Sequence, residues 1–123
     1  MQLSKTEEQV MQYLWKREKA FLKDLLQDFP DPKPATTTVA TLLKRMTDKG
    51  FINYTLFGKS REYYPLVKKS VYFSKHVNGL IKNFFNDSAS QFASFFTQET
   101  DLSNSELEEL KKIIDSQLKK QQK

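Results

Sequence analysis

Hydroxyl and cationic side chains gather within ten residues near the middle of the sequence, and a second group follows closely. The first group is Thr36, Thr37, Thr38, Thr41, Lys44 and Arg45, and the second is Lys59, Ser60 and Arg61. Threonine hydroxyls can bind phosphates or base edges, and their methyl groups can contact a thymine methyl. Lysine and arginine neutralise phosphates. Together the two groups have the chemistry of a nucleic-acid contact surface.

The positive charge of the chain is concentrated around these residues. The 123 residues carry a net charge of +5, from 20 Lys and Arg against 15 Asp and Glu. Between Lys33 and Arg61, six basic residues stand against one acidic residue, Asp48, so this window alone carries +5. An isolated cluster of charge is usually only a solvated surface. Its meaning therefore depends on the secondary structure that carries it.

Few residues offer any other chemistry. The chain has no cysteine, one histidine and three glycines, so we expect no metal site, no cofactor and no glycine-rich phosphate loop. The histidine, His76, falls in a predicted helix and is interpreted as a packing or surface residue. The sequence therefore predicts a protein that is not an enzyme. It has no apolar N-terminal segment and no run of about 18 apolar residues, so we expect a cytoplasmic protein without membrane insertion.

Apolar periodicity predicts three helices in the first part of the chain. A capping box of Ser4 and Glu7 precedes a helix over about 5–17. A second short helix reaches Phe29 and ends at the prolines that follow. The third runs over about 35–49, and its core stripe is Val39, Leu42, Leu43 and Met46. The threonines and cations of the first group lie on or beside the opposite face of this third helix.

A change to β-type sequence follows the third helix. Residues 51–57 and 61–64 are predicted strands, joined by a turn at Gly58-Lys59-Ser60. Three helices and then a hairpin is the order of a winged helix-turn-helix, in which the third helix enters the major groove and the wing lies along the backbone or minor groove. We therefore predict a mainly α fold with a winged helix-turn-helix domain over 1–67 that binds double-stranded DNA.

Two alternatives stay open at this point. Thr37 and Thr38 could merely cap the third helix, while the cations merely keep the surface soluble. The chain could also be a winged-helix module for protein–protein interaction, without sequence-specific DNA binding. Such a module would bind DNA weakly, and that binding would not respond to salt.

The rest of the chain, residues 68–123, predicts three more helices that form a dimerisation domain. Their expected spans are 70–86, around 89–96, and from Ser103 onward. Six of the ten phenylalanines lie between Phe73 and Phe96, more apolar surface than three short helices need alone. An intramolecular bundle is the alternative. The predicted dimer interface is Phe73, Val77, Leu80, Ile81, Phe84, Phe92, Phe96, Leu110 and Ile114.

Several motifs in these elements occur together in one known family. Residues 34–50, PATTTVATLLKRMTDKG, resemble the recognition helix of the penicillinase-repressor (BlaI/MecI) family. Residues 3–15 are similar to the opening of that family, Gly58 with Tyr63-Tyr64-Pro65 is similar to its wing, and residues 101–110 are similar to the start of its last helix. The resemblance implies a homodimeric bacterial transcription repressor that recognises palindromic operators.

The resemblance also implies a mechanism by which the repressor is released from DNA. A membrane-bound sensor metalloprotease is expected to trigger cleavage of an Asn-Phe bond in the dimerisation arm. Aligned from Leu102-Ser103, that bond corresponds to Phe95-Phe96, the candidate cleavage site. The asparagine is absent here, so neither the cleavage specificity nor a β-lactam signal carries over. A copper-responsive branch binds metal through cysteines, and a chain without cysteine cannot use that mechanism.

Overall fold

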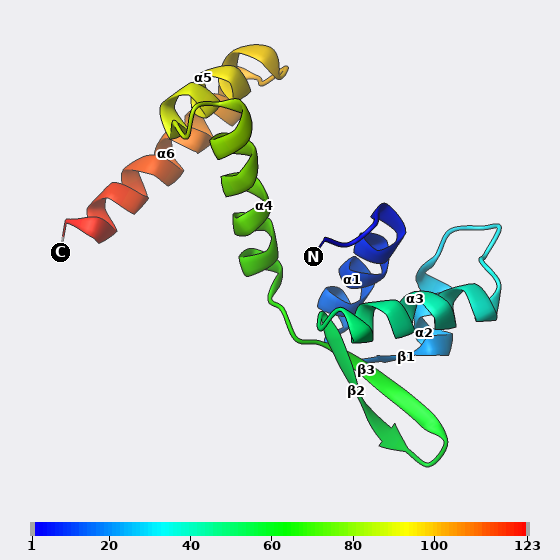
Figure 1. Cartoon of the computed structure of the whole chain (residues 1–123). Helices are drawn as coiled ribbons and strands as arrows, with labels where there is room; N and C mark the ends of the chain where they lie inside the picture. Colours follow the sequence, from blue (N-terminus) through cyan, green and yellow to red (C-terminus); the bar gives the residue numbers. More distant parts are fainter. Residues whose placement is uncertain (1, 123) are drawn as a thin grey trace. The chain divides into compact units, whose positions relative to one another are not determined.

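A computed structural model describes residues 2–122, and along the chain it divides into two compact units between Ser74 and Lys75. The first unit contains the helices α1 (Lys5–Arg17), α2 (Leu22–Asp28) and α3 (Thr36–Asp48), and the strands β1 (Ala20–Phe21), β2 (Ile52–Phe57) and β3 (Ser60–Pro65). Helix α4 (Lys69–Phe84) begins in the first unit and continues into the second, which also holds α5 (Ala89–Glu99) and α6 (Asn104–Gln121) (Figure 1). The predicted mainly α fold with a winged helix is confirmed.

Two helices begin with a capping box, and the one at α1 is the box predicted from Ser4 and Glu7. At α1, the Glu7 amide donates to Ser4 Oγ over 3.2 Å, and the Ser4 amide donates to Glu7 Oε1 over 2.8 Å. Ser103 and Glu106 form the same reciprocal pair at α6. Because each pair satisfies two backbone N–H groups that a helix end leaves unpaired, both helices begin at a defined residue.

The core of the first unit is built mainly from the faces that the three helices turn inward. The α3 stripe predicted from the sequence is buried, and Val39, Leu43 and Met46 are fully so. Val10, Met11 and Leu14 of α1 and Leu25 of α2 complete the central contacts with Ala20, Ile52 and Tyr63 from the sheet. Burial of this stripe fixes the rotation of α3, so its opposite face must point to solvent.

The sheet differs from the prediction in two ways. It has three strands in the order β1-β3-β2, because the two residues of β1 pair antiparallel with β3. A strand this short carries no periodicity that a sequence pattern could reveal. The turn of the hairpin also has two residues rather than three, since Ser60 belongs to β3 and pairs with Phe57. Gly58 provides the positive φ, 62°, that this tight turn requires.

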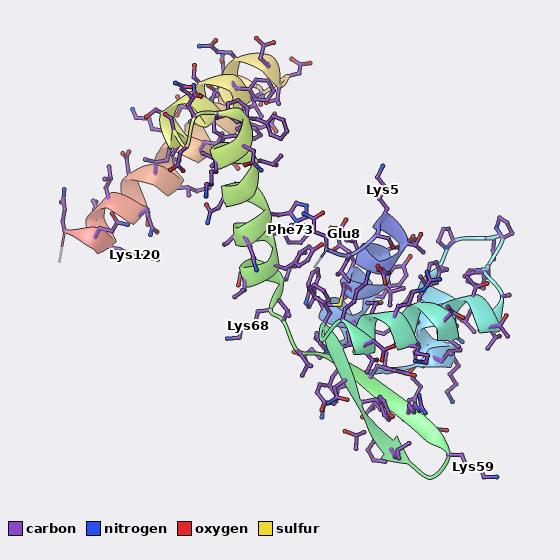
Figure 2. The ribbon with its side chains drawn as sticks, viewed as in Figure 1. Lys5, Glu8, Lys59, Lys68, Phe73 and Lys120 are labelled. Carbon is purple, nitrogen blue, oxygen red and sulfur yellow. The ribbon has the colours of Figure 1, made fainter. Side chains whose placement is uncertain are left out.

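The first turn of α4 belongs to the first unit and is held against α1. The Trp15 indole Nε1–H donates to the Val67 carbonyl over 2.8 Å, and the Tyr72 hydroxyl donates to Glu8 Oε2 over 2.6 Å. Phe73, which Figure 2 labels, follows Tyr72 in α4. Its ring centroid lies 5.8 Å from that of Trp15. The first unit therefore extends past residue 67, where we predicted the domain boundary, to Ser74.

The second unit has a core of aromatic rings but little burial. Phe85 packs against Phe92 and Phe95, with ring centroids 5.4 and 5.3 Å apart, and Phe92 stacks with Phe96. Within residues 75–122, no side chain reaches the burial of the first unit's core. The three helices therefore leave much of their apolar surface uncovered.

Candidate nucleic-acid interface

The outward face of α3 carries the first predicted group of site residues. We call this set the reading face, and all of its members are exposed: Thr36, Thr37, Thr38, Thr41, Lys44 and Arg45. The buried stripe of the same helix holds this face toward solvent. The hydrophobic periodicity of α3 thus predicted correctly that these side chains are exposed.

The threonines of the reading face do not cap α3. The N-cap residue is Ala35, and no side chain accepts a hydrogen bond from the first turn. The alternative in which Thr37 and Thr38 only cap the helix is therefore wrong. The Thr41 hydroxyl donates to the Thr37 carbonyl over 2.9 Å, so its oxygen can still accept a hydrogen bond from a partner. The uncapped N–H groups and the helix dipole make this end of α3 favourable for a phosphate.

The cations between Lys33 and Arg61 divide into those that support the fold and those that remain on the surface. Lys33 donates to the backbone carbonyls of Gln27 and Phe29, at 3.1 and 2.8 Å. Lys49 donates to Glu7 Oε1 over 2.8 Å and to the Gln2 carbonyl over 3.2 Å. Both lysines therefore hold segments of the first unit together. The remaining four cations of the window lie on the reading face or on the wing.

Those four surface cations differ in how they are paired. Lys44 forms an exposed salt bridge with Asp48, one turn further along α3, at 3.1 Å. Arg45 and Lys59 form no salt bridge within residues 2–122. Arg61 has no acidic partner in the same range, and its guanidinium carbon lies 4.5 Å from the centroid of the Tyr54 ring. Three of these cations are thus available to neutralise an external anion.

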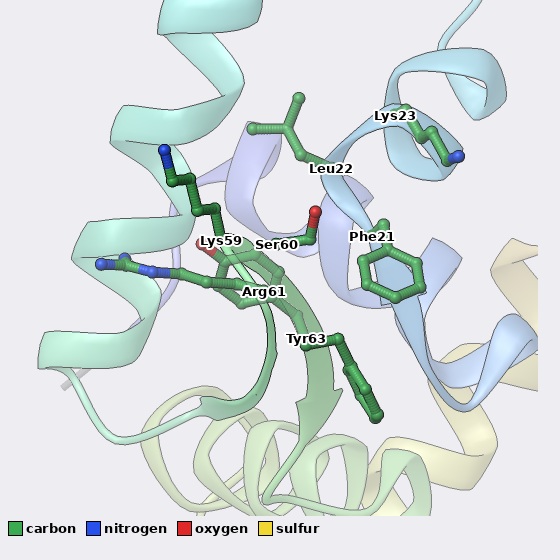
Figure 3. Close-up of a pocket in the computed structure, with 8 residues that line it drawn as sticks. Phe21, Leu22, Lys23, Lys59, Ser60, Arg61 and Tyr63 are labelled. Atoms are coloured by element: carbon green, nitrogen blue, oxygen red, sulfur yellow. The ribbon is translucent and has the colours of Figure 1, made fainter.

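The wing carries the second predicted group, Lys59, Ser60 and Arg61, all of them exposed. Lys59 extends from the tip of the hairpin (Figure 2). A groove of about 510 Å³ separates the wing from the start of α2, and Phe21, Leu22 and Lys23 form its other side (Figure 3). Lys23 adds a third cation to the groove. The sequence pattern did not single out Lys23, because the distance between α2 and the wing depends on the pairing of β1 with β3.

The side chains predicted for the dimer interface of the C-terminal helices are exposed to different degrees. Phe84 is 74% exposed and Ile114 is 60% exposed, while Ile81, Phe92 and Leu110 are half-buried. Val77, Leu80 and Phe96 are also exposed. Unlike the other predicted interface residues, Phe73 belongs to the first unit, where its ring packs beside that of Trp15. The candidate cleavage pair, Phe95 and Phe96, lies in the middle of α5 with both side chains exposed.

Other kinds of site have little support in the described part of the chain. Residues 2–122 contain no cluster of three or more His, Cys, Asp or Glu side chains that could hold a metal ion. Among the helices of the same range, none combines the length and the apolar character that crossing a bilayer requires.

Comparison with known proteins agrees with the geometry of the first unit. The sequence model of the penicillinase repressor family matches residues 3–116. The methicillin resistance regulatory protein MecI of Staphylococcus aureus strain N315 is 28% identical over 114 residues, which span 92% of this chain and 93% of that protein. The penicillinase repressor of Bacillus licheniformis is 24% identical over 115 residues, which span 93% of this chain and 90% of that protein. The chain therefore belongs to the penicillinase repressor family, a family of bacterial transcriptional repressors rather than enzymes.

Proposed function

We propose that the protein is a homodimeric repressor that acts in the cytoplasm and binds a palindromic DNA operator. Each copy places α3 in the major groove and lays its wing along the adjacent backbone. The observation that carries this proposal is the reading face, a row of hydroxyls and cations that the buried stripe of α3 turns to solvent. The DNA-binding residues proposed are Thr36, Thr37, Thr38, Thr41, Lys44, Arg45, Lys59, Ser60 and Arg61.

Within this set we assign two roles. The threonines at the start of α3 read base edges, because short hydroxyl side chains at a helix N-terminus come close to the floor of the major groove. Lys44, Arg45, Lys59 and Arg61 neutralise phosphates and position the protein on the duplex. The exposure of these eight side chains and the absence of acidic partners for Arg45, Lys59 and Arg61 within residues 2–122 support this division.

The dimer is supported by the uncovered apolar surface of the second unit. None of its described side chains is buried, and Phe84, Ile113 and Ile114 are each at least 60% exposed. From Lys68 onward the chain has 9 basic and 7 acidic residues, which is close to neutral and suits contact with a second copy. A two-fold dimer presents two α3 helices to two half-sites, which lie about 34–36 Å apart when they are one turn of DNA apart.

Release from the operator is proposed to follow a signal-linked event in the C-terminal arm, with a membrane sensor metalloprotease as the upstream partner. The bond between Phe95 and Phe96 is the candidate position. It lies in α5, a helix of 11 residues with no buried side chain. Short helices are marginally stable alone, so α5 can open locally and present an extended segment to a protease.

DNA binding is tested by fluorescence anisotropy with the full chain and a duplex selected from a random library, against a scrambled duplex. The logarithm of the affinity should fall linearly with the logarithm of salt, by about 0.9 per phosphate neutralised. Thr41→Ala should relax the preference for the selected duplex, whereas Lys59→Ala should weaken both duplexes about equally. Lys111→Ala, on α6, is the matched control and should change neither. Weak binding that is insensitive to salt would favour the protein-interaction module instead.

Dimer formation is tested separately by sedimentation equilibrium of the full chain. Phe84→Glu places a charge in the exposed apolar surface and should raise the dimer dissociation constant by at least about tenfold. Asn83→Glu, the neighbouring exposed position on α4, is the matched control and should leave it unchanged. A wild-type chain that stays monomeric at micromolar concentration would instead favour the intramolecular bundle.

A further inference from the structure

The wing holds one of its cations in a defined position without using an acidic side chain. The guanidinium of Arg61 lies over the ring of Tyr54, 4.5 Å from the centroid. Tyr54 and Arg61 come from opposite strands of the hairpin, β2 and β3. We propose that Tyr54 is a positioning residue for DNA binding, which orders Arg61 for a backbone phosphate before the DNA arrives. This inference rests on the function proposed above.

The register of the hairpin explains why these two side chains meet. Tyr54 lies directly opposite Tyr63, and Leu56 lies opposite Arg61. Arg61 is therefore the diagonal neighbour of Tyr54 on the same face of the sheet, and a long side chain reaches across such a diagonal. The geometry depends on the two-residue turn, because one more residue in the turn would move Arg61 to the other face.

The Tyr54 ring is itself fixed to the core. It is half-buried, and its centroid lies 5.6 Å from that of Tyr63, which is only 7% exposed. The phenolic hydroxyl of Tyr54 has no hydrogen-bond partner in the structure between residues 2 and 122, so the described fold makes no use of it. The ring face is the part of Tyr54 that contacts Arg61.

A stack of this kind suits phosphate binding better than a salt bridge does. An aromatic face attracts a guanidinium through its quadrupole but takes none of the N–H donors. The guanidinium of Arg61 donates no hydrogen bond within the described residues, so its donors can form a bidentate contact with a phosphate. Lys44, in contrast, must leave Asp48 before it can do the same. Ordering Arg61 in advance removes part of the entropy cost of binding.

A double-mutant cycle in the full-length protein tests this role. Tyr54→Leu should weaken binding to the selected duplex by about threefold to tenfold, and Tyr54→Phe should bind like the wild type. In an Arg61→Ala background, Tyr54→Leu should cause no further loss. The salt dependence should distinguish the two residues. Arg61→Ala should reduce the slope of log affinity against log salt by about one phosphate, whereas Tyr54→Leu should leave that slope unchanged. An equal loss from Tyr54→Leu in both backgrounds, or a loss from Tyr54→Phe, would overturn the inference.

Tyr54→Leu could also disturb the fold of the wing, so a second measurement tests the order of Arg61 in the wild-type chain without DNA. In the free wild-type chain, ¹⁵N relaxation of the Arg61 Nε–H group should show more order than that of Arg45, which forms no stack. Tyr54→Phe should keep this difference. An Arg61 side chain as mobile as Arg45 would overturn the inference while leaving the proposed repressor function intact. A wild-type chain that fails to bind DNA would overturn both.

Discussion

Lys49 Nζ donates a 2.8 Å hydrogen bond to Oε1 of Glu7, a carboxylate that is only 1% exposed. Lys49 is the C-cap of α3, and Glu7 lies in the first turn of α1. The same Glu7 oxygen accepts the Ser4 amide, while Oε2 is buried and has no partner within residues 2–122. The ion pair thus connects the end of α3 to the start of α1. The buried negative charge of Glu7 is neutralised by Lys49.

Removal of the lysine should therefore cost more than removal of the carboxylate. Lys49→Met leaves the Glu7 charge buried without its cation, and breaking such a pair destabilises by about 3 kcal/mol or more. Glu7→Gln keeps an acceptor for Lys49 and Ser4 and removes the buried charge, so its cost should be smaller. Urea unfolding of both variants measures the difference. An equally large loss in the two variants would contradict this account of the pair.

The stability of the first unit should fall in acid because of this carboxylate. Burial raises the pKa of Glu7, but the hydrogen bonds from Lys49 and Ser4 outweigh it and hold the pKa below its ordinary value. A group whose pKa is lower in the folded state stabilises the fold above its unfolded pKa and loses that contribution as pH falls through the folded pKa. The free energy of unfolding should therefore decline below about pH 4.3, the ordinary pKa of a glutamate in an unfolded chain. In Glu7→Gln that decline should be shallower, which urea titrations between pH 3 and 6 can detect.

At high pH, Tyr72 should limit the stability of the junction between α1 and α4. Burial and the hydrogen bond to Glu8 raise the pKa of Tyr72 to about 12. Because the unfolded chain ionises its tyrosines near pH 10, the free energy of unfolding should fall as pH rises from about 10 toward 12. Absorbance at the phenolate band should show a late step near pH 12 from Tyr72. In Tyr72→Phe that late step should disappear, and the loss of the bond should cost about 1–2 kcal/mol.

The helices and their faces could be predicted because their signals are local. The stripe of Val39 and Leu43 fixes the rotation of α3, and Ser4 with Glu7 marks the start of α1. These features need only the spacing of a few neighbouring residues. Exposure of the reading face follows directly from them.

The pairings between distant segments could not be predicted in the same way. Ala20 and Phe21 form a strand only because β3 lies beside them, and the paired residues Ala20 and Tyr63 are 43 positions apart in the sequence. The stack of Arg61 on Tyr54 depends on the number of residues in the turn. The predicted turn includes Ser60, and with that register Arg61 and Tyr54 would lie on opposite faces of the hairpin. A register that differs by one residue reverses the face of every side chain in a strand. The wing was therefore predicted as an element, but its contacts were not.

The acidic residue at the end of α3 should restrain DNA binding. Asp48 ends α3 and pairs with Lys44 at 3.1 Å, and the side chains of both are well over half exposed. An exposed pair of this kind adds little stability, about 0–1 kcal/mol, and a carboxylate at a helix C-terminus opposes the helix dipole. Asp48→Asn should therefore leave the unfolding temperature almost unchanged. It should also release Lys44 and remove a charge that repels phosphates.

The affinity of Asp48→Asn for the selected duplex should accordingly rise by about threefold to tenfold, with a salt dependence steeper by up to about one phosphate. Anisotropy titrations across a range of salt concentrations measure both quantities. Asp115→Asn, on α6, makes the same change of net charge far along the chain from the reading face and should have a much smaller effect. If the two variants gained equally, the effect would be one of overall charge. The Lys44–Asp48 pair would then not control how much of the positive charge of α3 is available to the DNA.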